Sequence, residues 1–161
     1  MTRHKIVTIA SAIAAIAAAA AIPVGLAGAQ ASRGKTQTLR VFDKPVAMTL
    51  TEPSGKVIGR PPYPQPSAGD VLDVYSLEYR GNHLHHAMHW SMSSHVRCTF
   101  GTGAPDCESH IAIGGSLLIF HGNKLEGGTG AYQGATGRVL SSKAIPGPGN
   151  RSDIVARIHR H

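Results

Sequence analysis

Histidines are concentrated in one short segment, His83-Leu84-His85-His86-Ala87-Met88-His89-Trp90. If this segment is a strand, His83, His85 and His89 share one face, because side chains alternate between the two sides of a strand. Imidazoles that converge in this way can bind zinc or copper. Further ligands could come from His95, His110 and His121. The alternative is a solvent-exposed face without a metal, and we expect no resident cofactor.

The opposite face of such a strand carries larger apolar side chains. Met88 and Trp90 alternate with the histidines, and Tyr75 belongs to an earlier apolar segment. We expect these three side chains to point inward and to line an apolar pocket for a small ligand. Ordinary core packing is the alternative interpretation.

The first 31 residues have the layout of an export signal. Arg3 and Lys5 precede an apolar run from Ile6 to Ile22, and Ala29-Gln30-Ala31 supplies small residues at its exit. We predict a secretory signal peptide over 1–31, cleavage after Ala31 and a secreted, extracellular protein. An uncleaved anchor stays open as the alternative. After cleavage we expect no contact with a membrane.

Export determines how the two cysteines, Cys98 and Cys107, are interpreted. They enclose eight residues rich in turn formers, Thr99 to Asp106. In an oxidising compartment an even pair at such spacing predicts a disulfide. Closing so short a ring constrains the unfolded chain by about 3 kcal/mol in the entropy model.

Composition excludes several classes of protein. The chain has 161 residues, with 16 Lys plus Arg against 9 Asp plus Glu. Loss of Arg3 and Lys5 with the leader lowers the net charge from +7 to +5. This balance is only mildly basic and no aromatic platform accompanies it, so we expect no nucleic-acid partner. Neither a Gly-x-Ser-x-Gly elbow nor a His-Glu-x-x-His motif is present.

The elements that must position these residues are strands. Val46, Met48 and Leu50 alternate with less apolar residues, and 71–79 and 153–159 show the same period of two. Gly114-Gly115 predicts a tight hairpin between two apolar strands, and Gly81-Asn82 is a second hairpin signal. The Pro-rich segment 59–69 predicts a loop, because four prolines lack the amide donor of a central strand. The fold class is all-β, as a barrel or a sandwich.

A glycine-rich run, Leu125 to Val139, is the most distinctive local sequence. A dinucleotide or phosphate loop is excluded, because Gln133 stands where the third glycine is required and no Gly-Lys-Ser/Thr follows. Glycines here indicate positive φ, tight turns or close approach of two chain segments, with Tyr132 packed over them. The residues assigned to this structural motif are Gly127, Gly128, Gly130, Tyr132, Gly134 and Gly137.

With its surroundings, this run resembles the allene oxide cyclase-like family, whose barrel is shared with dirigent proteins. The shared features are Gly69-Asp70 before a strand, Tyr79-x-Gly81 at its end, Cys98 late in the next strand and His121-Gly122. The resemblance extends from Gly69 to Val139 and, more weakly, over 39–50. It implies a single eight-stranded antiparallel β-barrel over 32–161, after an N-terminal signal helix. It also implies an apolar cavity and assembly into trimers.

The resemblance implies a small lipophilic or phenolic ligand whose cyclisation or coupling is guided in the cavity. For the carboxylate of the cyclases, Asp43 and Glu52 are both candidates. A dirigent role points to Asp43 or Asp73 with Tyr75. Ser76 replaces the Asn of the cyclases, and Cys98, assigned above to a disulfide, aligns with their cavity cysteine.

Whether the protein is an enzyme stays open, and an activity would be isomerase-like or cyclase-like. The alternatives are a non-catalytic secreted module for surface interactions and a His-rich metal-binding protein.

Overall fold

Alternating side chains form strands through most of residues 34–161, the part of the chain that the computed structural model describes. The strands are β1 (Lys35–Thr51), β2 (Val57–Ile58), β3 (Val71–Arg80), β4 (Met92–Thr99), β5 (Asp106–Ile113), β6 (Ser116–His121), β7 (Lys124–Gly128), β8 (Thr136–Ala144) and β9 (Ser152–Arg160). A 3-10 helix, η1 (Gly130–Tyr132), precedes β8. The predicted signal segment, 1–31, lies outside the described residues.

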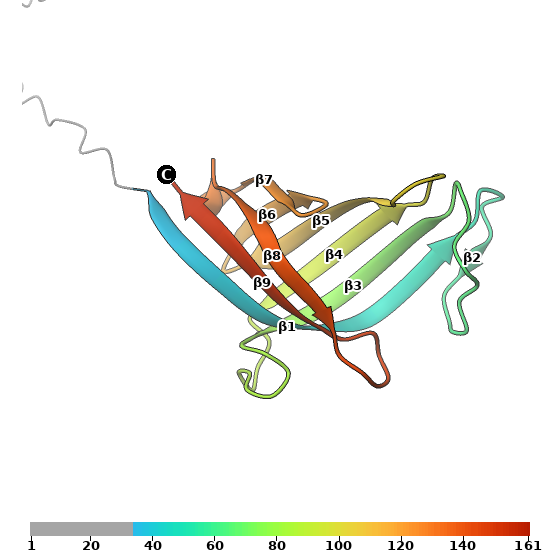
Figure 1. The fold of residues 1–161 in the computed structure, drawn as a ribbon, viewed down its shortest axis with the longest axis horizontal. Coiled ribbons are helices and arrows are strands. Elements are labelled where there is room, and N and C mark those ends of the chain that lie inside the picture. Colours follow the sequence, from blue (N-terminus) through green and yellow to red (C-terminus); the bar gives the residue numbers. More distant parts are fainter. Residues whose placement is uncertain (1–33) are drawn as a thin grey trace, which may run out of the picture. The chain divides into compact units, whose positions relative to one another are not determined.

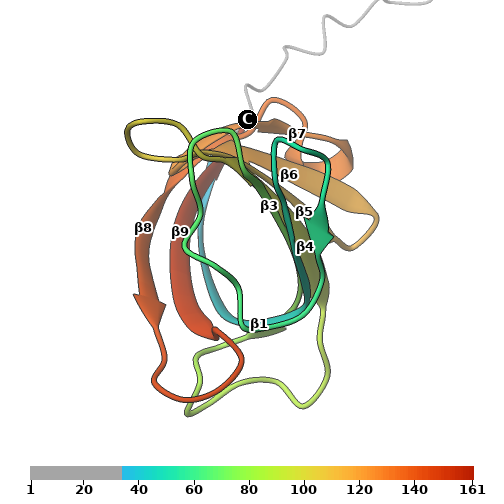
Figure 2. The same cartoon turned by 90° about the vertical axis from the view of Figure 1, so that its right-hand side faces the viewer.

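Eight of these strands close into an antiparallel barrel (Figures 1 and 2). Each of β3 to β9 pairs with its neighbour in the chain, and β1 pairs with both β3 and β9. The two-residue strand β2 is an appendage on the end of β1. The prediction of an all-β, eight-stranded antiparallel barrel is therefore confirmed.

Closure depends on the length and bend of β1. Its 17 residues pair first with β9, over Lys35–Asp43, and then with β3, over Val41–Thr51. The register shifts between Pro45 and Ala47, which is where a residue without an amide donor is tolerated. This irregularity lets one strand serve both sides of the barrel.

The connection between β5 and β6 is the predicted hairpin. Gly114 and Gly115 have φ of 53° and 77°. Two successive positive φ values suit the right-handed twist of the flanking strands, and glycine adopts them without a steric penalty.

The histidine segment is not a strand, and this expectation was wrong. Residues 81–91 form a long loop between β3 and β4. The Asn82 side-chain oxygen accepts hydrogen bonds from the amides of Leu84 and His85, at 3.0 and 2.8 Å. His83 binds Asp153 through its amide and its ring, at 2.7 and 2.6 Å. These local bonds compete with strand pairing, so the period-two pattern does not apply here.

The glycine-rich run folds back tightly at the end of β7. A Cβ on Gly128 would lie 2.9 Å from the Tyr132 side chain and against the Leu117 carbonyl oxygen. Gly130 has φ of 56° and lies against Ser116, whose hydroxyl accepts a hydrogen bond from the Ala131 amide at 3.0 Å. Tyr132 is buried beneath this turn. The glycines therefore allow close approach of chain segments.

Replacement of Gly128 by Ala tests this close approach. We expect Gly128→Ala to lower the free energy of unfolding by about 1–3 kcal/mol, the usual effect of forcing a carbon into filled space. Gly127→Ala is the matched control, because a Cβ there meets nothing within 4 Å. Urea unfolding of both variants measures the difference, and equal losses would contradict this description of the turn.

The Pro-rich residues 59–69 contain no strand, as predicted. The Tyr63 hydroxyl donates a hydrogen bond to the Met48 carbonyl oxygen at 2.8 Å, and Asp70 accepts one from the Ser67 amide at 2.7 Å. Both bonds hold the loop against the start of β3 and the end of β1. Within residues 34–161, no helix has the length and apolar character needed to span a membrane.

The core fills part of the barrel interior. Its buried cluster comprises Leu39, Val41, Met92, Ile113, Leu118, Phe120, Leu125, Tyr132, Ala135, Ala156 and Ile158. Leu39, Val41, Phe120 and Ala156 also form part of the wall of an internal cavity. The interior is therefore packed in one part and hollow in another.

Candidate functional site

The hollow part of the barrel is a cavity of about 300 Å³. Most of its wall is apolar, with side chains that include Val74, Val96, Ile111, Phe120 and Ile154. A smaller polar group consists of Asp43, Ser76, Glu78, Ser94, Ser109, Asn150 and Ser152. A mostly apolar cavity with a few polar groups is the usual form of a small-molecule site.

Strand alternation brings the polar group together. In β3, Ser76 and Glu78 are buried, whereas Tyr75, the residue directly before Ser76, is exposed. Asp43 is opposite Glu78 in the register of β1 and β3, and opposite Ser152 in the register of β1 and β9. The two carboxyl groups therefore come from directly paired residues on neighbouring strands.

Glu78 is the buried carboxyl group of this site, with 2% of the residue exposed. Burial in the barrel raises the pKa of Glu78 to about 7; a hydrogen bond from Ser94 opposes the shift, and the charge of Asp43 adds to it. Its Oε2 atom is buried and has no hydrogen-bond partner within residues 34–161. A carboxyl group in this state can donate or accept a proton near neutral pH.

Asp43 is in a more polar environment than Glu78. Burial raises the pKa of Asp43, and hydrogen bonds from the Ser76 and Ser152 hydroxyls oppose this shift. The Ser152 hydroxyl lies 3.4 Å from Asp43 Oδ2. Hydroxyl donors stabilise the ionised carboxylate, so the two acids have different environments on one wall.

The predicted ligand-binding side chains are on the outside of the barrel. Tyr75, Met88 and Trp90 are all exposed, and none lines the internal cavity. The Tyr75 ring stacks on the His95 ring, with centroids 4.4 Å apart. The prediction that these three side chains point inward was wrong. In β3 the side that carries Ser76, and not Tyr75, faces the interior, and residues 81–91 form a loop and not a strand.

The predicted carboxylates are separated by the fold. Asp43 lines the cavity. Glu52 follows β1 and forms an ion pair with Lys56 at 3.4 Å, outside the cavity. Asp73 faces the outer surface, where it binds His95 at 2.8 Å and lies 3.9 Å from Arg97. Of the candidates that the resemblance left open, the structure therefore brings only Asp43 to the cavity; a catalytic role stays a prediction.

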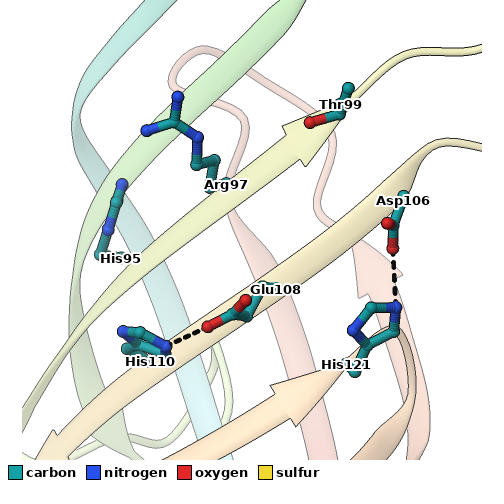
Figure 3. A pocket seen from close by; sticks show the side chains of 7 residues that line it. All are labelled: His95, Arg97, Thr99, Asp106, Glu108, His110 and His121. Atoms are coloured by element: carbon teal, nitrogen blue, oxygen red, sulfur yellow. Dashed lines mark hydrogen bonds and ion pairs between the residues drawn. The ribbon is translucent and has the colours of Figure 1, made fainter.

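A second hollow lies on the outer face of β4, β5 and β6 and has a volume of about 190 Å³ (Figure 3). It is lined by His95, Arg97, Thr99, Asp106, Glu108, His110 and His121. His121 pairs with Asp106 at 2.7 Å, and His110 pairs with Glu108. These imidazoles are engaged with carboxylates, and exposed pairs of this kind contribute little to stability.

The histidines proposed as metal ligands are not gathered into one cluster. His83 binds Asp153, whereas His95, His110 and His121 line the outer hollow. In the part of the chain that the structure describes, no group of three or more His, Cys, Asp or Glu side chains is arranged to hold a metal ion. A metal at His83, His85 and His89 stays a prediction.

The predicted disulfide is confirmed. Cys98 in β4 and Cys107 in β5 are direct partners in the antiparallel register and are bonded, with Cα atoms 4.1 Å apart. Among residues 34–161 there is no free cysteine. Cys98 therefore offers no free thiol to the cavity.

Sequence reasoning missed Glu78 as a site residue. The apolar pattern of β3 places Tyr75, Leu77 and Tyr79 on one side, which suggests that this side is buried. Within β3 itself, the polar pair Ser76 and Glu78 gives no signal for burial; its partners in β4 are Ser94 and the buried Met92. Only the register with β1 and β4 shows that this pair faces the interior.

Comparison with solved structures supports the fold. A structure titled pyocyanin demethylase matches with a TM-score of 0.53 and 14% sequence identity, covering 74% of this chain and 99% of that chain. At this identity the match shows a shared barrel fold and nothing finer. No protein-family model and no curated protein matches this sequence.

Proposed function

We propose that the barrel binds a small lipophilic or phenolic molecule in its internal cavity and moves a proton on it. Glu78 carries this proposal, because the residue lines the cavity and one of its carboxyl oxygens is buried and unpaired within residues 34–161. Burying a polar atom without a hydrogen bond is unfavourable, so a ligand with an O–H or N–H group would supply the missing partner.

The two carboxyl groups suit an isomerisation, such as a ring closure or the completion of a coupling. Glu78 holds or releases a proton near neutral pH, and Asp43 supports positive charge that develops beside it. The apolar wall would restrict the conformations of the bound ligand, and this restriction would supply selectivity. The matched structure titled pyocyanin demethylase has the same barrel fold and is named for an enzyme activity, which is compatible with an enzyme of this fold.

Secretion belongs to the same proposal. The disulfide Cys98–Cys107 suits an oxidising compartment, as does the leader composition of residues 1–31. A secreted barrel would meet its ligand outside the cell. More specifically, the proposed reaction is a guided cyclisation or coupling of the ligand, as in the families that the sequence resembles.

Binding of N-phenyl-1-naphthylamine tests the cavity. This probe is neutral and aromatic, has one N–H donor, and becomes fluorescent in apolar surroundings. We expect saturable binding of one probe per chain. Val96→Phe should abolish it, because Val96 lines the cavity and the larger ring occupies the space of the probe.

Val57→Phe is the matched control, because Val57 lies in β2 with 61% exposure and makes no part of the cavity wall. It should bind the probe as the wild type does. Circular dichroism establishes that both variants are folded, and Glu78→Gln, which keeps the size of the side chain, gives a second test within the cavity. Saturable binding that survives Val96→Phe in a folded protein would place the probe elsewhere and contradict the proposal.

A further inference from the structure

The charged side chains that line the barrel cavity are all of one sign. Asp43 from β1 and Glu78 from β3 line it together with hydroxyl groups and one amide, and none of the described residues in its wall is Lys, Arg or His. Arg151 lies between two lining residues in the sequence, Asn150 and Ser152, but does not itself line the cavity. A molecule bound in the cavity therefore meets carboxyl groups and no cation among residues 34–161.

The hydrogen-bonding capacity of the two carboxyl groups is only partly used. Asp43 accepts hydrogen bonds from the hydroxyls of Ser76 and Ser152. Glu78 accepts one from the hydroxyl of Ser94, and its Oε2 atom is buried without a partner within residues 34–161. An ionised carboxylate has about four acceptor positions on its two oxygens. Acceptor positions for a ligand therefore remain on this wall.

The two carboxyl groups also affect each other. Asp43 and Glu78 are direct partners in the register of β1 and β3. Burial raises the pKa of Glu78, and the charge of Asp43 adds to this shift. A cation beside both groups would favour their ionised forms, whereas an anionic ligand would bring a further negative charge into the same apolar surroundings. A neutral hydroxyl supplies one donor and no charge.

We propose that the cavity selects lipophilic amines, which bind as ammonium ions with the nitrogen beside Glu78 and Asp43. A primary ammonium group has three N–H donors and no acceptor, which suits a wall with free acceptor positions. Apolar side chains such as Val96, Ile111 and Phe120 would surround the hydrocarbon part of the ligand. This inference rests on the function proposed above and narrows it to one class of ligand, against lipophilic carboxylates.

The size of the preference depends on two opposing effects. Moving an ammonium group out of water is unfavourable, and only close pairing with further hydrogen bonds offsets this. Hydrogen bonds between charged partners are roughly twice as strong as those between neutral groups. Two carboxyl groups on one wall provide both the charge and the acceptors, so we expect the amine to be preferred.

Three ligands of similar shape test the selection: 4-butylbenzylamine, 4-butylbenzyl alcohol and 4-butylbenzoate. At about pH 7.5 they are a cation, a neutral molecule and an anion. Isothermal titration calorimetry with the wild-type protein measures the dissociation constant of each ligand. We expect the amine to bind on the order of tenfold more tightly than the alcohol, and the benzoate to bind more weakly than both. An alcohol or a benzoate that binds as tightly as the amine would overturn the inference.

Removal of each carboxyl group locates the bound amine. Glu78→Gln and Asp43→Asn keep the shape of the side chain, and each should weaken amine binding on the order of tenfold with little change in alcohol binding. Two separate substitutions keep the test decisive where circular dichroism shows that one variant is unfolded. Glu126→Gln, on an exposed residue of β7, is the matched control and should bind all three ligands as the wild type does. Amine binding that survives the cavity substitutions in folded protein would place the amine on another acidic group and overturn the inference.

The result for N-phenyl-1-naphthylamine distinguishes failure of this inference from failure of the proposed function. Where that probe binds in the cavity and the amine is not preferred over the alcohol, the binding function stands and the selection for amines is wrong. Where neither the probe nor any of the three ligands binds to folded protein, both are wrong.

Discussion

Glu78→Gln should abolish most of the loss of stability that the wild-type protein shows between about pH 5 and pH 8. Because burial raises the pKa of Glu78 from 4.5 to about 7, the folded protein keeps this proton in a range where the unfolded chain has released it. Stability from this group is complete below pH 4.5 and falls as the pH rises to about 7.

The magnitude follows from the same shift. A change of one pKa unit corresponds to about 1.4 kcal/mol, so ionisation of Glu78 lowers the free energy of unfolding by about 3 kcal/mol at neutral to alkaline pH. Glutamine has nearly the same shape and cannot ionise. The variant should therefore be the more stable protein at about pH 8 and should lose that advantage at about pH 5.

Urea unfolding across this pH range measures the effect, as the difference between variant and wild type at each pH. Glu126→Gln is the matched control, because Glu126 is exposed in β7 and pairs with Lys124 at 3.5 Å. Its pH dependence should follow that of the wild type. Parallel stability curves for Glu78→Gln and the wild type would show that Glu78 ionises inside the barrel without a penalty.

Removal of the disulfide is the second large expected effect. Replacing Cys98 and Cys107 by serine removes the covalent bond that closes a ring between two residues nine positions apart in the sequence. The entropy model gives a loss of about 3 kcal/mol in the free energy of unfolding. The barrel should still fold, because the paired strands β4 and β5 keep their register through their other residues.

Two measurements separate the covalent bond from the packing of the two side chains. Urea unfolding of the double serine variant is compared with that of the wild type under a reductant. Both should show the same loss, since each lacks the bond. Full stability in the reduced wild type would mean that the bond contributes nothing and would contradict this expectation.

The barrel could be predicted from sequence because it depends on local patterns. Alternation in 153–159, the Gly114-Gly115 turn and the glycine-rich run each specify one local geometry, and together they are consistent with a closed antiparallel sheet. The disulfide was predicted from two cysteines together with the expected export of the chain. These features need no knowledge of which strands meet.

The site was less predictable because it depends on register and on which face of a strand is buried. A shift of one residue exchanges the inner and outer side chains of a strand. In β3 the apolar aromatic side faces outward, where Tyr75 stacks on His95, and the polar side with Glu78 faces the cavity. Long-range pairing with Asp43 decides this, and nothing within the β3 sequence does.

The histidine segment shows the same limit in another form. His83-Leu84-His85 alternates as a strand would, but Asn82 supplies side-chain hydrogen bonds that shape a loop. Asp153, which binds His83, is 70 residues away in the chain. The loop conformation therefore depends on a contact that local periodicity does not contain.

Carboxyl ¹³C NMR of Glu78 tests the central claim most directly, with the pH titrated in the free protein and in the protein saturated with N-phenyl-1-naphthylamine. A buried carboxyl group in the ligand cavity should titrate with a midpoint of about 7 in the free protein, and bound probe should move that midpoint. A midpoint near the ordinary value of 4.5, unchanged by the probe, would contradict both the burial of Glu78 and its place in the binding site.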